Sequence, residues 1–201
     1  MPQPEAPIRL PQPRFSGPAS LEQALLARRS TRAIARDPLT VDELTQLLWA
    51  AQGVTRAQGF RTAPSAGALF PLELHVAAGC VTGLRTGLYR YRPLEHALVA
   101  SVPRDLRAEL CRAALSQRPV ERAPAVFLLT AVYGRSTATY GERGVRYADL
   151  EAGHAAQNLI LQAAALDLKA VVVGAFGDAD VRRIALLPPE EEPLYLVPVG
   201  R

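Results

Sequence analysis

The sequence predicts a layered α+β fold in which helices cover a mixed β-sheet, and three observations support that prediction. First, apolar residues follow helical spacing in some segments and the continuous or alternating spacing of strands in others. Second, these helices and strands are interspersed, but a strand–turn–strand pair interrupts the regular alternation that a parallel sheet requires. Third, 49% of the 201 residues are hydrophobic and 21% are charged, which is ordinary for one globular domain.

A proline-rich arm of residues 1–20 precedes the domain, which we expect to span residues 21–201. The prolines of the arm stand at positions 2, 4, 7, 11, 13 and 18. Because proline lacks an amide donor and restricts the residue before it, we expect the arm to be extended.

The first predicted helix spans residues 21–28 and begins after Ser20, whose hydroxyl suits an N-cap. We expect its apolar side chains to face inward; they are Leu21, Ala24, Leu25 and Leu26. The second predicted helix spans residues 41–52. Thr40 caps it, Glu43 occupies the capping-box position three residues later, and Gly53 ends it.

The rest of the chain is predicted to mix strands with helices. Strands are expected at 72–79, 87–93, 96–102, 125–133, 169–176 and 193–199, and the second and third of these form a hairpin. Helices are expected at 104–115, at 145–168 and, after a capping Asp178, up to about residue 186.

Composition excludes several functional classes. The formal net charge is +4, but the basic residues are spread along the chain and Lys169 is the single lysine, so nucleic-acid binding is not expected. No apolar run is long enough to cross a bilayer, and the N-terminus lacks the pattern of a signal peptide. We therefore expect a cytoplasmic protein with no membrane partner.

Cysteine and histidine are too few and too scattered to suggest a metal site. Cys80 and Cys111 are the only cysteines, and we expect both thiols to be reduced. The histidines stand apart at positions 75, 96 and 154, and the motifs CxxC and HExxH are absent.

The stretch LLARRSTRAI at residues 25–34 concentrates positive charge. Arg28 and Arg32 share a face if the helix continues, and Arg28, Ser30 and Arg32 share a side if the chain is extended. Either geometry aims two guanidiniums and a hydroxyl in one direction, which suits a phosphate. The alternative is that these arginines only offset the dipole at the end of a helix.

Two further stretches combine small residues with turns. RTAPSAGALFP at 61–71 presents little side chain around Gly67, so that backbone amides can approach a flat ligand; the alternative is a plain connection before a strand. VVVGAFGDAD at 171–180 leaves the N–H groups around Gly174 and Gly177 at the end of a strand, a usual place for a ligand. The alternative there is a simple strand–turn–helix. Neither GxGxxG nor GxxxxGK[ST] occurs, so a Rossmann site and a P-loop are unsupported.

The stretch 140–168 contains the long helix predicted at 145–168, which has Ala, Gly and Leu around its whole circumference. This pattern suggests burial on most sides, as at a dimer interface. His154 is expected to be a hydrogen-bonded interior histidine. Arg146 and Tyr147 either face a cleft or serve in capping and packing. Arg201 ends the chain after a predicted strand, where a frayed terminus is the alternative to a binding role.

Taken in order, these stretches resemble the nitroreductase superfamily of flavoproteins, and in particular its SagB-type dehydrogenases, which include azoline oxidases. The resemblance runs from about Leu21 to Arg201. It rests on RRSTR, APSAGALFPLELHV, GLYRYRPLEHAL, RYADLEAGHAAQNLILQAAALDL, GAFGD and PLYLVPVGR. Many nitroreductases have an Asn-type residue near Ala68 and a tryptophan near Leu72, and this chain has neither.

The resemblance implies a homodimer with a three-layer α-β-α sandwich, a mixed and mainly antiparallel sheet, and one FMN at each subunit interface. It implies that the phosphate, ribityl chain and pyrimidine edge of FMN are held by Arg28, Arg29, Ser30 and Arg32, with Arg201 adding to the phosphate clamp. The residues implied to line the isoalloxazine ring from the other subunit are Pro64, Ser65, Ala66 and Gly67. The residues implied to offer backbone donors near flavin N5 are Gly174 and Ala175.

The implied activity is that of an FMN-dependent oxidoreductase that transfers hydride through flavin N5. NAD(P)H-driven reduction of a small quinone- or nitro-type acceptor is the first candidate. Oxidation of an azoline or related heterocycle, as by a SagB-type dehydrogenase, is an alternative, and a non-catalytic flavin-binding homologue is another. Azoline oxidases use a lysine–tyrosine pair near the flavin; the matching pair here is Arg146–Tyr147, so Tyr147 is the candidate proton-transfer group.

Overall fold

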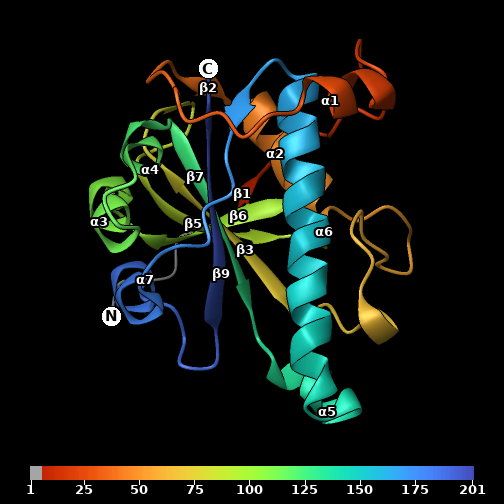
Figure 1. The fold of residues 1–201 in the computed structure, drawn as a ribbon. Helices are drawn as coiled ribbons and strands as arrows, with labels where there is room; N and C mark the ends of the chain where they lie inside the picture. The colour runs from red at the N-terminus through yellow and green to blue at the C-terminus, as the bar shows by residue number, and fades with distance from the viewer. Residues whose placement is uncertain (1–5) are drawn as a thin grey trace.

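The computed structural model describes residues 6–201, and its centre is a seven-stranded sheet (Figure 1). The strand order is β1-β6-β5-β3-β7-β9-β8, and every neighbouring pair in this sheet is antiparallel. The strands are β1 (Ile8–Arg9), β3 (Leu72–Ala78), β5 (Gly87–Arg92), β6 (Ala97–Val102), β7 (Ala125–Ala131), β8 (Lys169–Ala170) and β9 (Glu192–Gly200). A separate parallel pair joins β2 (Leu39–Thr40) to β4 (Val81–Thr82).

Helices cover both faces of the sheet, which confirms the predicted α+β fold of three layers. One face carries α2 (Val41–Gln52) and the long α6 (Arg143–Ala165), with α1 (Leu21–Ala27) against α6. The other face carries α3 (Arg107–Ala113), α4 (Arg118–Arg122) and α7 (Asp178–Ala185). The short α5 (Gly134–Tyr140) lies at the beginning of α6, and η1 (Ala66–Ala68) lies on the loop between α2 and β3.

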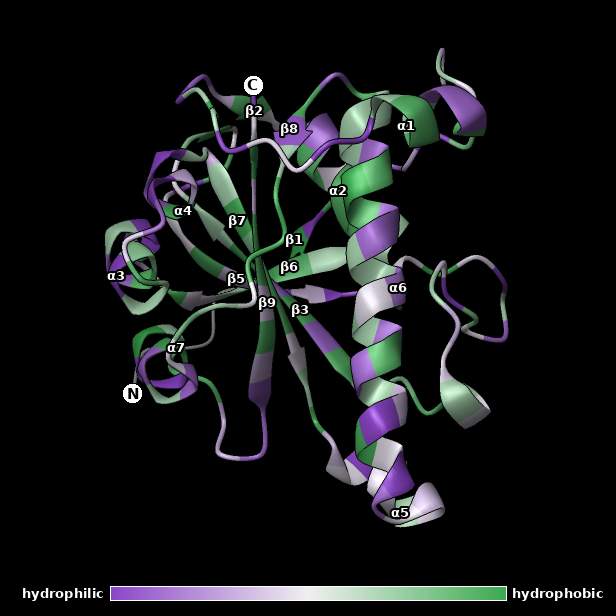
Figure 2. Ribbon diagram, viewed as in Figure 1, coloured by the Kyte–Doolittle hydropathy of each residue, from purple (hydrophilic) through white to green (hydrophobic). Residues whose placement is uncertain are grey.

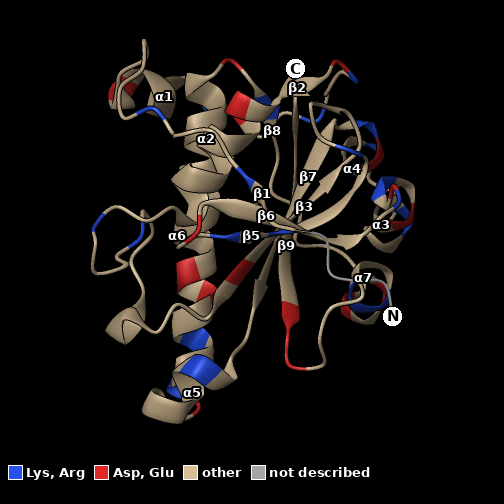
Figure 3. Cartoon of the chain, turned by 180° about the vertical axis from the view of Figure 1, so that it is seen from behind, with Lys and Arg blue, Asp and Glu red and all other residues tan. Residues whose placement is uncertain are grey.

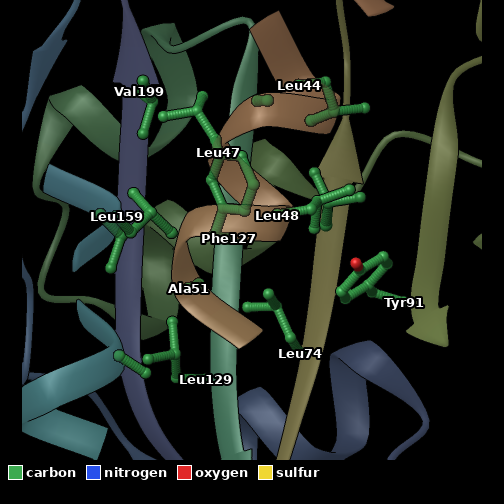
Figure 4. Close-up of a cluster of buried hydrophobic side chains, with 14 of the residues drawn as sticks. Leu44, Leu47, Leu48, Ala51, Leu74, Tyr91, Phe127, Leu129, Leu159 and Val199 are labelled. Carbon is green, nitrogen blue, oxygen red and sulfur yellow. The ribbon is translucent and has the colours of Figure 1, made fainter. Parts of the chain in front are cut away.

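The core on the α2–α6 face forms because the apolar residues of each element recur on one side. Leu44, Leu47 and Leu48 of α2 are fully buried and lie close to Phe127 of β7 and Leu159 of α6 (Figure 4). Burial of one such leucine contributes about 2 kcal/mol. Because side chains alternate along a strand, the neighbouring residues of β7 enter the second core on the other face.

The capping predictions for the first two helices are confirmed. The Ser20 hydroxyl accepts a hydrogen bond from the Gln23 amide, and the Thr40 hydroxyl accepts one from the Glu43 amide, both at 3.1 Å. Helix α2 ends at Gly53, as predicted. A Cβ on Gly53 would lie 2.1 Å from the Trp49 ring, so only glycine fits this close turn.

The prediction that the leucines of the first helix face inward was wrong. Only Ala24 of α1 is buried, whereas Leu21, Leu25 and Leu26 are 63%, 50% and 76% exposed. Helix α1 packs against α6 at the edge of the molecule. It therefore buries only the narrow face that carries Ala24 and leaves its leucines exposed to solvent. Figure 2 shows α1 mostly in the green of hydrophobic residues, which marks an uncovered apolar surface.

The strand predicted at 169–176 is mostly irregular. Only Lys169–Ala170 forms a strand, and Val173 adds a single bridge to Leu196. This segment lies at the sheet edge, where one side has no neighbouring strand to hold it. The chain also forms β1, α4 and α5, which were not predicted, and Gly177 rather than Asp178 occupies the N-cap of α7.

The arm follows the edge of the fold from Ile8 onward; the prolines at positions 2 and 4 lie outside the described residues. Strand β1 pairs with β6, and the Pro11 carbonyl lies 2.9 Å from His96 Nε2. Farther along, the Arg14 amide and carbonyl bond the Gln46 side chain of α2 at 2.8 and 3.0 Å. The arm is therefore extended, as predicted, and packed.

Charged residues of the described chain lie on helices and loops far more often than on strands. Figure 3 shows both signs on α3, α4 and α7, while most of the sheet carries none. None of the helices in the described part of the chain is both long and apolar enough to cross a membrane. Within residues 6–201, no three or more His, Cys, Asp or Glu side chains gather as a metal site.

Candidate functional site

The arginine segment leaves α1 in an extended conformation and runs beside the end of the sheet. Arg28 is the C-cap of α1, with φ −52° and ψ 123°. Two residues later Ser30 forms a parallel bridge with Ala170 of β8, and the Thr31 amide donates to the Ala170 carbonyl at 2.9 Å. Of the two predicted geometries the chain adopts the extended one, in which alternate residues share a side.

The guanidiniums of this segment differ in what they contact. Among residues 6–201, no ion pair forms to Arg28 or Arg32, whereas Arg36 reaches Glu121 at 4.0 Å. Arg29 turns back to its own helix, where Nη1 donates to the Leu26 and Arg28 carbonyls, both at 2.8 Å. Arg29 thus satisfies backbone carbonyls at the end of α1, as the alternative interpretation expected. Arg28 and Arg32 have no carboxylate within residues 6–201 to neutralise their charge.

Arg201 is held beside the same segment and is not frayed. Its carbonyl accepts from the Ala35 amide at 2.5 Å, and the preceding Gly200 pairs with Lys169 of β8. The Nη2 of Arg201 donates to Glu43 Oε1 at 2.7 Å, while its Nη1 is buried and has no acceptor among residues 6–201. A buried N–H of a guanidinium without an acceptor is costly, so this atom indicates a role in binding an anion.

Glu43 has a role that sequence analysis did not find. Burial alone would raise the pKa of its carboxyl, but bonds from the Thr40 amide and the Arg201 guanidinium outweigh burial and hold that pKa below its ordinary value. Its position in a capping box was visible in the sequence. Its contact with Arg201, 158 residues away, depends on the tertiary fold.

A cavity of about 150 Å³ adjoins the arginine segment. Arg28, Arg29 and Thr31 line one side, and Ile160 and Ala164 of α6 line the other. Arg201 lies outside this lining, so the cavity covers only the α1 side of the cluster. Figure 1 shows α1, β8 and the C-terminus together at one end of the sheet.

Gly174 and Ala175 lie on the same edge of the sheet, farther from the chain end. Val173 exchanges backbone hydrogen bonds with Leu196 of β9 at 2.8 and 2.9 Å, which fixes the start of the turn. The next two residues are exposed, and within the described chain their amides donate to no protein acceptor. Gly174 is four residues beyond Ala170, which corresponds to about 13 Å along a strand.

The loop that carries Pro64, Ser65, Ala66 and Gly67 lies elsewhere. Gly67 has φ 60°, and a Cβ there would lie 2.7 Å from the Tyr140 hydroxyl. Tyr140 packs edge-on against Tyr147 with ring centroids 5.1 Å apart. Gly67 and Tyr147 are therefore neighbours near the beginning of α6, about 20 Å along the helix axis from Ile160, where the arginine cavity touches α6. The loop runs along α6 between these points, because Asn158 donates to the Thr62 carbonyl at 3.1 Å just before Pro64.

A buried polar cluster supports this loop and was also missed by sequence analysis. Glu151 of α6 is 3% exposed, and burial raises its pKa to about 7 despite the Ser65 hydroxyl and the nearby Arg61 guanidinium. Arg61 donates to Gln52 Oε1 at 2.8 Å and stacks on Phe70, 4.3 Å from the ring centroid. A lone Glu on a long helix gives no sequence signal for such a cluster.

The donors of one chain fit part of a flavin mononucleotide. A dianionic phosphate suits Arg28, Arg32 and the orphaned Nη1 of Arg201, and exposed amides at Gly174 suit the polar edge of a ring. The small loop residues that would cover the ring are not part of the lining of the arginine cavity. The predicted site residues thus form two groups, one around the cavity at Ile160 and one that extends along α6 toward Tyr147.

Comparison with known proteins gives the family. The model of the nitroreductase family matches residues 25–201. A protein of Methanocaldococcus jannaschii named as a putative nitroreductase is 46% identical over 181 residues, which cover 90% of each chain.

Two solved structures, both named as putative nitroreductases, are similar in sequence and fold. The one from Ralstonia eutropha is 32% identical with a TM-score of 0.84, and the match covers all of this chain and 94% of that one. The one from Anabaena variabilis is 34% identical with a TM-score of 0.81; the match covers 90% of this chain but only 38% of that longer one.

More distant structures share the fold alone. A microcin synthetase complex of E. coli has a TM-score of 0.75 at 23% identity, and the NADPH:FMN oxidoreductase of Vibrio harveyi has a TM-score of 0.65 at 20% identity. The family match over nearly the whole chain, the relative at 46% identity and the shared sheet topology agree. The chain belongs to the nitroreductase family and is a flavin-dependent oxidoreductase.

Proposed function

We propose that the protein is an FMN-dependent oxidoreductase that uses NAD(P)H to reduce a small quinone- or nitro-type acceptor. The observation that carries the proposal is the buried Nη1 of Arg201, which lacks an acceptor beside a segment whose Arg28 and Arg32 lack carboxylate partners. A doubly negative phosphate is the ligand class that satisfies such a set. When bound, FMN supplies hydride acceptance and delivery at N5.

In this proposal each region of the chain has its own task. Arg28, Ser30 and Arg201 bind the phosphate and the adjoining ribityl chain, and Arg32 places positive charge near the pyrimidine edge. Arg29 contributes through its backbone and by ending α1, since its guanidinium is occupied there. The exposed amides of Gly174 and Ala175 donate to the ring edge near N5.

We further propose that the site is completed by a second copy of the chain. Gly67 and Tyr147 lie about 20 Å along α6 from the arginine cavity, and the loop does not line that cavity, which favours a ring covered by another copy. A twofold dimer brings the loop of one copy to the arginines of the other. The exposed leucines of α1 give such an interface its apolar surface.

The proposed reductant draws on a structural neighbour. The Vibrio harveyi enzyme is named NADPH:FMN oxidoreductase and its structure contains NAD+, which makes a nicotinamide the first candidate for this fold. We also propose a cytoplasmic location, with residues 21–201 as the FMN-binding domain and residues 1–20 as an N-terminal arm.

A second candidate is oxidation of an azoline or related heterocycle. It is favoured by Tyr147, which stands next to Arg146 and packs beside the glycine of the ring-lining loop through Tyr140. The fold shared with a microcin synthetase complex is consistent with this candidate. The pKa of an arginine side chain is so high that the guanidinium keeps its proton, so Arg146 cannot act as a base beside Tyr147. In this candidate Tyr147 would transfer the proton without that partner.

Spectroscopy and rapid kinetics test these candidates. We expect the purified protein to be yellow, with FMN as the flavin released on denaturation. In stopped flow, NADH or NADPH should bleach the bound flavin rapidly. A flavin that resists both nicotinamides points to heterocycle oxidation or to a non-catalytic homologue, and a colourless protein that does not bind added FMN refutes the proposal.

A further inference from the structure

Glu43 divides its two carboxylate oxygens between two tasks. Its Oε2 accepts from the Thr40 amide at 2.8 Å and from the Thr40 hydroxyl at 3.1 Å, which completes the capping box of α2. Its Oε1 accepts from Arg201 Nη2 at 2.7 Å. The carboxylate is thus fixed to the first turn of a helix on one side and to the last residue of the chain on the other.

We propose that Glu43 is the positioning residue for Arg201, holding its guanidinium so that the buried Nη1 faces the phosphate of the bound flavin; this inference rests on the proposed function. The Arg201 side chain is 41% exposed, and the Glu43 side chain is 17% exposed. A C-terminal arginine without such a partner would lose much rotamer freedom on binding. Glu43 removes that freedom in advance.

Simple electrostatics predicts the opposite effect, which makes the inference testable. A carboxylate beside a phosphate repels it, so removal of the Glu43 charge alone should tighten binding of the phosphate. If positioning dominates, removal of the charge should loosen binding. The sign of the change therefore separates the two effects.

The variant Glu43→Gln keeps the capping position while removing the charge, since glutamine also serves in capping boxes. Its single oxygen can accept from Thr40 or from Arg201, but not from both as the carboxylate does. FMN and riboflavin are titrated into the flavin-free protein, with quenching of flavin fluorescence as the signal. Riboflavin lacks the phosphate, so the ratio of the two dissociation constants isolates the phosphate contribution.

We expect the dissociation constant for FMN to rise about tenfold in Glu43→Gln, the size of one charged hydrogen bond, while that for riboflavin stays nearly constant. A merely structural role in the cap would weaken both flavins equally. Unchanged or tighter binding of FMN would overturn the inference.

Two further variants separate this inference from the proposed function. Asp42→Asn removes one negative charge from the adjacent, exposed residue of α2. We expect this variant to leave the ratio of the FMN and riboflavin dissociation constants unchanged, or to tighten FMN binding slightly. Arg201→Gln should weaken FMN selectively. If Arg201→Gln does not change the ratio, the phosphate site itself is wrong; if it does and Glu43→Gln does not, only the inference about Glu43 fails.

Discussion

Two regions of this molecule are incomplete in opposite ways. The arginine end, formed by Arg28, Arg29, Ser30, Arg32 and Arg201, has its backbone tied to β8 and to the chain end but carries charge with too few acceptors. The loop end, formed by Pro64–Gly67 and Tyr147, has its own buried polar cluster and aromatic contacts. The first region presents charge that suits an anion, and the second presents small residues and an aromatic pair that suit a flat surface.

The difference shows how one site can be divided along a long helix. Helix α6 has 23 residues, and its buried side is built largely from alanines, so it lies close to the sheet as a rigid spacer. In the proposed site, phosphate recognition lies near its end, and the loop that would cover the ring runs along it toward its beginning. Each region folds with its own end of the helix, so variants of the two should have separable effects.

Removal of Arg28 and Arg32 should have the largest effect on flavin binding. We expect Arg28→Ala with Arg32→Ala to weaken FMN by roughly 3 kcal/mol or more, because each charged hydrogen bond contributes about 1.5–3 kcal/mol. Fluorescence titration measures it, and riboflavin should be affected less. Arg36→Ala, which removes one charge of the same sign from an exposed pair with Glu121, is the control. Undiminished FMN binding in the double variant would refute the phosphate assignment.

The loop end should make stability depend on pH. Burial raises the pKa of Glu151 from an ordinary 4.5 to about 7, so between these values the carboxyl is protonated in the folded chain and ionised in the unfolded one. The contribution of Glu151 to folding stability is therefore greatest below pH 4.5 and falls by roughly 3 kcal/mol as pH rises from there through 7. The Arg61 guanidinium limits this loss.

Urea unfolding of the wild type and of Glu151→Gln from pH 5 to 8 measures this effect. We expect Glu151→Gln to remove most of the decline, while Glu190→Gln, at an exposed loop position, should retain it. A wild-type profile that is flat across this range, or one that rises with pH, would contradict the account.

Tyr147 should affect turnover without affecting flavin binding. Tyr147→Phe removes the hydroxyl and keeps the ring that packs on Tyr140, and we expect turnover to fall about a hundredfold, the lower range for a lost general acid. FMN affinity should not change. Tyr140→Phe is the control at the neighbouring ring. Equal turnover in wild type and Tyr147→Phe would remove the proton-transfer role.

The smallest expected effect lies at Gly67. With φ at 60° and the Tyr140 hydroxyl 2.7 Å from a Cβ, Gly67→Val should cost about 1–2 kcal/mol of stability and shift the loop. Thermal unfolding measures the cost. Gly17→Ala, where nothing lies within 4 Å of the added atom, should leave the midpoint unchanged. Equal midpoints for both variants would show that the loop tolerates a side chain at Gly67.

Local signals were enough to predict the elements that position the site. The capping boxes at Ser20 and Thr40 depend on residues three apart, and the apolar runs of β3 and β7 are buried on both faces. Such patterns specify secondary structure wherever neighbours in sequence are also neighbours in space. The expectation of an extended arm at residues 1–20 depended on the restriction that proline places on the local backbone. The structure agrees with it for residues 6–20, the part of the arm that it describes.

The remaining features depend on tertiary contacts that no short window contains. The apolar run at 169–176 looked like a buried strand, but it lies at a sheet edge with few partners. The leucines of α1 followed helical spacing, yet residues 6–201 leave each of them at least half exposed. Glu43 and Glu151 acquire their roles from Arg201 and Arg61, and both pairings require the finished fold.

Co-expression of two differently tagged copies tests most directly the claim that two chains build each site. One copy carries Arg28→Ala with Arg32→Ala, and the other carries Ala66→Asp in the ring-lining loop. Each variant alone should bind little FMN. The purified heterodimer should bind about half as much FMN as the wild-type dimer, because one of its two sites combines intact arginines with an intact loop. If both regions served the flavin of their own chain, the heterodimer would contain no intact site, and the absence of FMN from it would contradict the account.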